Sequence, residues 1–432
     1  MNFSQTLIII SLTAILLATL LLQLPVATRD GISWFDALFT ATSAFTVTGL
    51  IVVDVGATFT IFGQIIILIL IKAGGIGIMT FAILAFMMLG KKIGFKERLM
   101  LQQTLNQESL GGIIKLVKRI FLYSLLMEAI ATVLLAIRWV PIYGFWRGLY
   151  YSFFHAVSSF NNAGISVFSR GLNPYMTDAF VSLIITTMFI IGGMGFVVLI
   201  DINNKRSFKR LSLHSKIMII GTIVVNLAAT LLFFALEMQN PATIGQLATS
   251  EQLVVSYFQA TSTRTAGFGP ITIDYFRTST TMLMLFLMFV GSGSAATSGG
   301  IKLTTFVVII YACIAFIRGR KQVIIAHRTI KERIIIRSFT ILSVSFFLVI
   351  MSVFVLTMTE QLPANKLFFE VVSALSTVGL SMGVTENLTY FGRFIIMILM
   401  FFGKIGPLTL AFSLARANQE KIIYPSEDIL TG

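Results

Sequence analysis

One short pattern occurs four times in this chain of 432 residues, and its residue types could coordinate a cation. In each copy an aromatic residue stands ten positions before a glycine and a hydroxyl residue stands six positions before it. The tripeptides that end at the four glycines are Val47-Thr48-Gly49, Asn162-Ala163-Gly164, Thr265-Ala266-Gly267 and Thr377-Val378-Gly379. Their side chains agree loosely, whereas the glycine is constant. The repeated feature is therefore the backbone.

A glycine after small or β-branched residues suits an extended strand that ends in a conformation other residues avoid. Four such strands around one axis would present rings of carbonyl oxygens, which replace the water shell of a potassium ion in a selectivity filter. One copy alone would be weak support, because glycines in membrane helices usually serve packing. Four copies in the same local context predict a filter.

A second pattern, a glycine cluster, follows each copy after 25, 28, 32 and 24 residues, so the third repeat is the longest. The surplus residues there are Gly291, Ser292, Gly293, Ser294, Ala295, Ala296, Thr297, Ser298, Gly299 and Gly300. This run is too rich in glycine and serine for a stable helix. A helix broken at membrane depth must line a cavity or be buried in protein. We therefore predict a gate, a flexible loop under the filter, rather than a kink packed against neighbouring helices.

Two basic residues lie close to these patterns. Lys404, beside the fourth glycine cluster, could donate to the serine-rich loop and hold it closed. Arg264 precedes Gly267 by three residues, and a bare cation in the filter would repel the permeant ion. Because cations inside a membrane usually have a partner, we expect Arg264 to pair with a buried acid such as Glu370 or Glu128.

The composition is that of an integral membrane protein. The chain is 56% hydrophobic with a mean hydropathy of +0.91, and 12% of its residues are charged. Its net charge of +14 would suggest nucleic acid as the partner of a soluble protein, but here the basic residues lie between apolar spans. The single cysteine, Cys313, excludes a disulfide framework within the chain and is expected to be a buried small hydrophobe.

Each repeat is predicted to contain an outer helix, a short re-entrant helix, a filter strand and an inner helix, since about 20 apolar residues are needed to span a bilayer. The predicted fold is an all-α integral membrane protein with eight transmembrane helices and four re-entrant segments around one central pore. The predicted repeats are residues 1–90, 91–203, 204–320 (with the interrupted inner helix) and 321–432. The predicted outer, re-entrant and inner segments are 7–24, 34–45 and 59–89; 120–137, 150–160 and 179–200; 217–236, 252–262 and 280–317; and 338–358, 365–375 and 390–414.

The basic residues predict the orientation. Residues 91–119, 205–216, 318–337 and 416–421 hold 21 of the 32 lysines and arginines, all on one side of the predicted spans. The positive-inside rule makes that side cytoplasmic. We therefore expect a multi-pass membrane protein with both termini inside and the filter open outward.

Taken together, the fourfold filter pattern, the single glycine per filter strand and the interrupted third inner helix resemble the Trk/Ktr/HKT superfamily of cation transporters, and within it the membrane subunits of bacterial Ktr potassium uptake systems. The resemblance covers residues 5–416. It implies potassium (K⁺) as the permeant ion, since sodium-selective plant relatives typically carry serine where this chain has Gly49. A sodium-selective or poorly selective member of the superfamily is the alternative.

The same resemblance implies a homodimer, with one pore per subunit, on a cytoplasmic ring of RCK-domain subunits that bind ATP and ADP. It also implies stimulation by sodium (Na⁺), and it matches residues 291–300 to the intramembrane gate of the family. The family usually has arginine where this chain has Lys404, which could loosen the closed state because lysine lacks the planar fork of arginine.

Other function classes have less support. The chain has no nucleotide-binding glycine motif, and its histidines, His155, His214 and His327, lack metal-ligand spacing, so no enzyme and no cofactor bound by this chain are expected. A solute transporter built on broken helices would predict inverted repeats, whereas these four run parallel. A membrane scaffold would leave the regular filter spacing unexplained.

Overall fold

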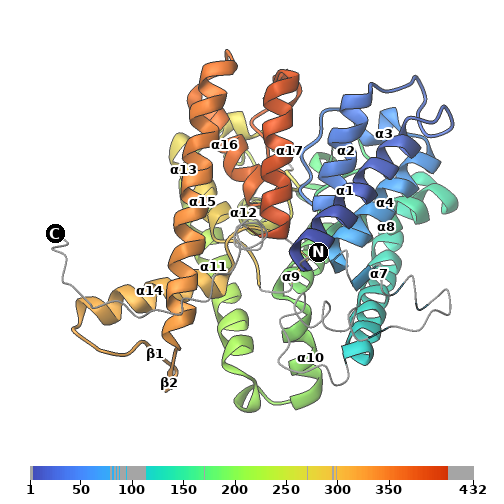
Figure 1. The fold of residues 1–432 in the computed structure, drawn as a ribbon. Helices are drawn as coiled ribbons and strands as arrows, with labels where there is room; N and C mark the ends of the chain where they lie inside the picture. Colours follow the sequence, from blue (N-terminus) through green and yellow to red (C-terminus); the bar gives the residue numbers. More distant parts are fainter. Residues whose placement is uncertain are drawn as a thin grey trace.

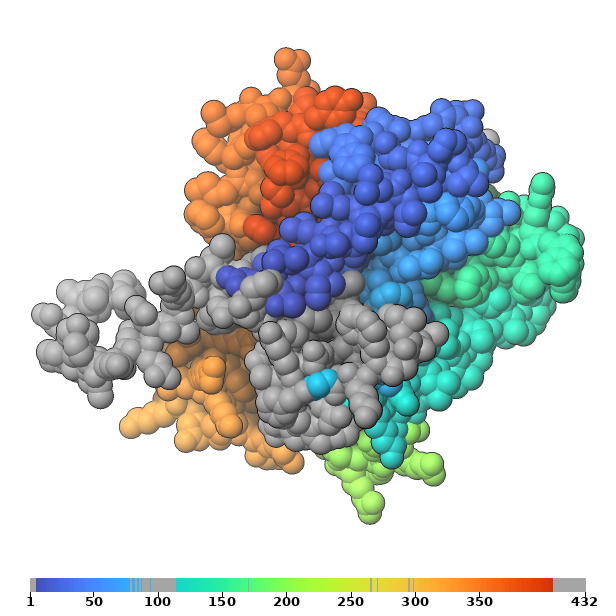
Figure 2. Space-filling view, turned by 45° about the vertical axis from the view of Figure 1, so that its right-hand side comes forward, coloured from blue at the N-terminus to red at the C-terminus, as the bar shows by residue number. Residues whose placement is uncertain are grey.

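The computed structural model describes residues 3–77, 80, 81, 84, 87, 94, 113–169, 171–269, 271–293, 296, 297 and 299–406. Four long helices in this part form the outer elements of the repeats: α1 (Phe3–Leu22), α7 (Ile113–Tyr143), α11 (Leu213–Glu237) and α15 (Glu332–Thr359). Each is long and apolar enough to cross a bilayer, and 17% to 33% of its most apolar stretch is buried in the protein. Figure 2 shows α1 lying along the surface of the molecule. The exposed apolar faces of these helices are suited to lipid.

A short helix follows each outer helix and ends at the repeated pattern. These pore helices are α2 (Trp34–Thr46), α8 (Phe145–Phe160), α12 (Thr249–Thr265) and α16 (Ala364–Leu375). Each packs against the outer helix of its own repeat. Their C-terminal halves are almost fully buried, as a re-entrant segment at membrane depth requires. The prediction of an all-α membrane protein with four helix/pore-loop/helix repeats is confirmed.

The inner helices are α4 (Ile61–Ile76), α9 (Ala179–Met194), α13 (Thr278–Phe289) and α17 (Tyr390–Ile405), and they are shorter than the sequence predicted. Three of them end at glycines whose φ angles are +92° (Gly77), +93° (Gly195) and +91° (Gly406). These angles favour glycine over residues that carry a Cβ. These three inner helices therefore end at the last glycine of the glycine cluster in their repeat.

In the second and third repeats the described residues show how the chain goes on after the inner helix. After Gly195 the chain resumes as α10 (Phe196–Lys205), bent by 90° from α9, so the prediction of one helix over 179–200 was wrong. The third inner helix is interrupted as predicted, and α14 (Leu303–Ile317) follows the interruption. Figure 1 shows α14 lying across α15 instead of continuing the direction of α13.

The remaining elements are short. They are α3 (Val55–Thr58), the 3₁₀ turns η1 (Asn173–Tyr175), η2 (Phe208–Arg210), η3 (Ile273–Tyr275) and η4 (Thr385–Asn387), and the antiparallel strands β1 (Ile324–Ile325) and β2 (Arg328–Thr329). The sequence did not predict the hairpin, which lies in the basic segment after α14. Cys313 of α14 is exposed, so its predicted burial was wrong.

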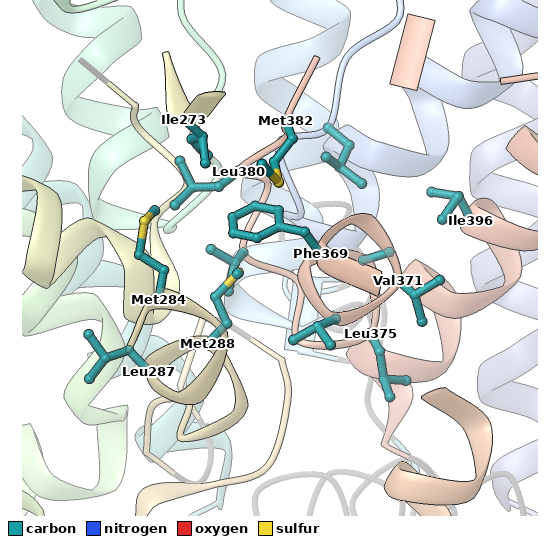
Figure 3. Packing of buried hydrophobic residues seen from close by; sticks show 14 of the residues in the cluster. Ile273, Met284, Leu287, Met288, Phe369, Val371, Leu375, Leu380, Met382 and Ile396 are labelled. Atoms are coloured by element: carbon teal, nitrogen blue, oxygen red, sulfur yellow. The ribbon is translucent and has the colours of Figure 1, made fainter. Parts of the chain in front are cut away.

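Apolar packing fixes the fourth pore helix between its neighbours. Phe369 of α16 is fully buried, and Figure 3 shows its ring between Met288 of α13 and Met382 of the loop after the fourth glycine. Ile396 of α17 packs in the same cluster. Because α16 contacts both α13 and α17, its C-terminal end is held in one position relative to the third and fourth repeats.

Candidate functional site: a ring of four glycines and the loop beside it

The four repeated glycines converge on one another. A Cβ atom added to Gly49 would lie 2.4 Å from the carbonyl oxygen of Ala163, and one added to Gly164 would lie 2.4 Å from that of Ala266. The series continues from Gly267 to the oxygen of Val378 and from Gly379 to the oxygen of Thr48, both at 2.0 Å. Each glycine therefore faces the carbonyl that precedes the glycine of the next repeat. The four strands form a closed ring.

The pore helices use the amide groups of these strands and leave their carbonyls free. The amide nitrogens of Thr48, Ala163, Gly267 and Val378 donate to serine carbonyls at the ends of the pore helices, over 2.8 to 3.3 Å. Those serines are Ser43, Ser158, Ser262 and Ser373. Because the donors point back into the helices, the carbonyl oxygens are available for a ligand inside the ring.

The serine hydroxyls hold the strands in two different ways. The hydroxyls of Ser43 and Ser373 accept from the amides of Gly49 and Gly379, both at 3.1 Å. The hydroxyl of Ser158 donates to the carbonyl of the residue after Gly164, over 2.7 Å. Ser262 does the same in the third repeat, at the same distance. Each strand is thus fixed by its own pore helix.

Three strands carry a strained residue two positions before the glycine. The φ angles are +58° for Val47, +58° for Asn162 and +50° for Thr377. This region is strongly disfavoured for the β-branched Val47 and Thr377, at a cost of about 1–3 kcal/mol each, whereas asparagine tolerates it better. Strain of this kind persists only where the surroundings over-determine the backbone, and it is concentrated at functional sites.

The third strand is one residue shorter than the others. Thr265, the equivalent of the strained residues, is still part of α12, and four residues separate Ser262 from Gly267 where five separate Ser43 from Gly49. The alignment on glycines therefore assigned the wrong hydroxyl to the third copy. Thr261 bonds the carbonyl of Tyr257 in its own helix, whereas Ser262 holds the strand. The run Ser262-Thr263-Arg264-Thr265 contains several hydroxyls, and nothing in it indicated that the alignment should shift by one residue.

The loop that interrupts the third inner helix lies against the glycine ring. Its two ends are joined, because Gly291 N donates to Ile301 O over 2.9 Å and Leu303 N donates to Ser292 O over 3.0 Å. Near its C-terminal end, Gly299 N donates over 2.7 Å to the hydroxyl of Thr377, a residue of the fourth strand. Ser294, Ala295 and Ser298 of the predicted gate lie outside the described residues.

The loop also contacts the breaks of two inner helices. Gly293 N donates to Gly193 O over 2.8 Å, at the end of α9. On the other side, Lys404 Nζ donates to the carbonyl of Thr297, so the predicted contact between Lys404 and the loop is present. The Thr297 hydroxyl donates over 3.2 Å to the side-chain oxygen of Asn162, when that amide is oriented so that both its oxygen and its nitrogen have hydrogen-bond partners. The loop therefore spans from the second repeat to the fourth, next to the ring.

Arg264 pairs with no acid among the residues that the structure describes. Its guanidinium donates over 2.7 Å to the Asn226 amide oxygen and over 3.2 Å to the Gly291 carbonyl. The predicted partners are engaged elsewhere: Glu128 pairs with Lys72, and Glu370 accepts from Thr385. Arg264 therefore joins the third pore helix to the first residue of the loop. The buried side-chain amide of Asn226 was a signal that the sequence analysis missed.

Lys72 and Glu128 form a buried ion pair between the first and second repeats. Their Nζ and Oε1 atoms are 2.5 Å apart, and the Glu128 side chain is 4% exposed. Ser124 and Asn161 also bond Glu128 Oε1, over 3.1 Å and 3.0 Å. Asn161 caps the C-terminal end of α8, next to the second strand. The pair therefore links α4, α7 and the pore helix of the second repeat.

The chain is similar in sequence to known cation transport proteins. Residues 4–423 match the family model TrkH, described as a cation transport protein. The chain is 50% identical to the Ktr system potassium uptake protein B of Bacillus subtilis (strain 168), over 97% of this chain and 94% of that protein. It is 40% identical to the protein of the same name from Vibrio alginolyticus, over 98% and 94%.

The solved structure of the potassium transporter TrkH from Vibrio parahaemolyticus has the same fold. It superposes with a TM-score of 0.75 at 18% sequence identity, covering 94% of this chain and 84% of that one. The family match spans nearly the whole chain and includes the four ring glycines and the loop. The chain therefore belongs to the TrkH family of cation transport proteins.

Proposed function

We propose that this protein takes up potassium through the ring of glycines. The observation that carries the proposal is the closure of that ring, in which each glycine faces a free carbonyl of the next strand. Carbonyl oxygens arranged around an axis replace the hydration shell of potassium. The filter consists of Val47 to Gly49, Asn162 to Gly164, Thr265 to Gly267 and Thr377 to Gly379. The names of the Bacillus and Vibrio relatives support potassium as the ion.

The pore helices add a favourable field to the filter. Their C-terminal ends, which carry the partial negative charge of the helix dipole, adjoin the strands. Three carbonyls at these ends, of Phe45, Phe160 and Leu375, lie against inner-helix glycines, where an added Cβ would approach within 1.8 to 2.0 Å. The inner helices can therefore pack close enough to fix the helix ends around a cation.

The test is uptake in cells that lack their own potassium transporters. Expression of this chain is expected to restore growth at low external potassium, with rubidium accepted and sodium discriminated against. Equal uptake of sodium and potassium would favour the sodium-selective or poorly selective alternative. No rescue, with the protein confirmed in the membrane, would contradict the proposal.

The loop of residues 291–300, held by Lys404, acts in this proposal as the gate. Its bonds to Gly193, to Thr377 and to Lys404 hold it beside the ring, which supports a role in obstructing the pathway. Deletion of Ser294 to Thr297 is expected to raise potassium flux in the absence of any partner subunit. Unchanged flux, or a stable but inactive transporter, would contradict the gate.

The regulatory arrangement is also part of the proposal. The protein forms a homodimer in the bacterial plasma membrane with both termini cytoplasmic, and an RCK ring that binds ATP and ADP controls its gate, with sodium as a stimulant. The basic segments 205–216 and 318–337 lie on the predicted cytoplasmic side and are the surfaces such a ring would approach. Co-expression of an RCK subunit should raise uptake further, and copurification of the two proteins should depend on these segments.

A further inference from the structure

A set of buried polar side chains occupies one position on all four pore helices. The position lies three residues before the serine that holds each strand, and it is occupied by Thr40, His155, Gln259 and Glu370. None of these residues is more than 1% exposed. Burying a polar group is costly without a hydrogen-bond partner. We therefore looked at which group each of these four side chains bonds. The partners differ from repeat to repeat.

In the second repeat this side chain reaches the outer part of its own strand. His155 Nδ1 lies 2.8 Å from the carbonyl of Tyr151, and because a carbonyl only accepts, Nδ1 carries the proton. His155 Nε2 lies 2.9 Å from the hydroxyl of Ser166, two residues after Gly164. In the neutral ring Nε2 therefore accepts from Ser166. Ser166 in turn accepts from the Phe168 amide over 3.0 Å, which closes a serine turn.

The fourth repeat builds the same turn and reaches it through one more residue. Ser381, two residues after Gly379, accepts from the Gly383 amide over 3.1 Å. Its hydroxyl lies 3.0 Å from that of Thr385, and Thr385 donates to the buried Glu370 carboxylate. The second carboxylate oxygen has no partner among the described residues. Glu370 is thus connected, through Thr385, to Ser381 at the end of the fourth strand.

In the first and third repeats the described residues show no such connection. Thr40 donates to the Asp36 carbonyl of its own helix, and the residue two after Gly49 is Ile51. In the third repeat both amide atoms of buried Gln259 are without a partner in the described part of the chain. The residue two after Gly267 is Gly269, which has no hydroxyl to offer.

We propose that His155 and Glu370 are positioning residues for ion selectivity, because they hold the outer ends of the second and fourth filter strands through Ser166 and Ser381. The ring order places these two strands opposite each other. Besides the serine contacts that hold all four strands, the filter therefore has this second brace along one diagonal, and the described residues show none along the other. This inference rests on the proposed potassium filter, and it adds residues that lie behind the filter and never touch the ion.

The experiment compares potassium and sodium uptake by purified protein in liposomes of fixed lipid composition. Glu370→Ala, Ser381→Ala and Ser166→Ala are each expected to lower the ratio of potassium to sodium uptake by roughly three- to tenfold, the range set by the loss of one buried hydrogen bond. Glu370→Gln keeps an oxygen that accepts from Thr385 and should restore most of the ratio. A general structural role would lower both fluxes together and leave the ratio unchanged.

Two results separate failure of this inference from failure of the proposed function. Wild-type protein that does not take up potassium would contradict the function itself. Wild-type protein that takes up potassium, with serine variants that keep its selectivity, would overturn the brace. Both serines are half-buried, so their alanine variants should fold even if Glu370→Ala does not.

A substitution at Gly269 tests whether selectivity can be raised by adding a missing hydroxyl. Its φ angle is not in the left-handed region, and an added Cβ would first meet the flexible end of Leu380 at 3.2 Å. Gly269→Ser should give Gln259 a hydroxyl partner and raise the ratio of potassium to sodium uptake above that of Gly269→Ala. Equal ratios of potassium to sodium uptake in the two variants would contradict the claim that Gln259 can hold its strand once a hydroxyl is supplied.

Discussion

At the scale of single residues, the glycines of the ring are required by contact as well as by conformation. Gly49 has a φ angle of +91°, and its Cβ position is 2.4 Å from the Ala163 oxygen. Gly31 has a similar angle of +80° with no atom within 4 Å of its Cβ position. A side chain at Gly31 would meet backbone strain alone, whereas one at Gly49 would also collide with a neighbouring carbonyl.

Gly49→Ser is therefore expected to lower the ratio of potassium to sodium uptake by at least about tenfold, which corresponds to about 1.4 kcal/mol of lost discrimination. The added side chain displaces the Ala163 carbonyl from the ring. Gly31→Ser is the matched control, since it imposes the same strain away from the ring and should leave the ratio unchanged. Isotope uptake in reconstituted vesicles measures both, and equal ratios for wild type and Gly49→Ser would remove this glycine from the filter.

The ion pair of Lys72 and Glu128 is also a matter of single residues. Glu128→Gln leaves the buried Lys72 cation without its counter-charge and should destabilise the protein by about 3 kcal/mol. The double variant Lys72→Met, Glu128→Gln removes the charge and keeps an oxygen for Asn161, so it should recover most of this loss. Thermal unfolding of detergent-purified protein measures the difference, and a double variant as unstable as Glu128→Gln would contradict the explanation.

At the scale of elements, the inner-helix breaks and the loop belong together. The breaks expose backbone groups at Gly193 and bring Lys404 to the carbonyl of Thr297. Arg264 attaches the start of the loop to the third pore helix through the Gly291 carbonyl. The loop is thus held by elements of the second, third and fourth repeats, and its position depends on how those elements sit.

Lys404 provides the prediction at this scale. Lys404→Gln weakens the bond to Thr297 and should raise potassium flux without a partner subunit by several-fold, whereas Lys404→Arg adds donors in a planar fork and should lower it. The control is Lys366→Gln, which removes a partly exposed ion pair with Asp274 outside the loop and should leave the flux unchanged. Flux through liposomes measures all three, and equal flux in the two Lys404 variants would contradict a holding role.

At the scale of the whole molecule, orientation in the membrane decides which face meets the partner subunits. The charge distribution predicts that Gly31 lies outside and Lys209 lies inside. In a Cys313→Ala background, Gly31→Cys should react with an impermeant thiol reagent in intact cells. Lys209→Cys should react only after the membrane is opened. The opposite labelling pattern would reverse the predicted topology.

The sequence by itself determined the number of repeats, the starts of three helices and the four glycines, because apolar length and a rare backbone conformation leave local signals. Trp34, Ala179 and Tyr390 begin helices where the sequence predicted them. The sequence also predicted the interruption before Ile301, since a run of glycine and serine cannot remain helical.

Only the tertiary structure decided which groups meet. It showed the 90° bend at Gly195, the shift from Thr261 to Ser262 and the pairing of Arg264 with Asn226 instead of an acid. Each of these depends on contacts between segments far apart in the chain, where a buried amide can replace a carboxylate as hydrogen-bond partner. The residue types within one segment do not determine which hydrogen-bond partner a buried group finds. Several partners would be chemically suitable, and the packing of distant segments selects one of them.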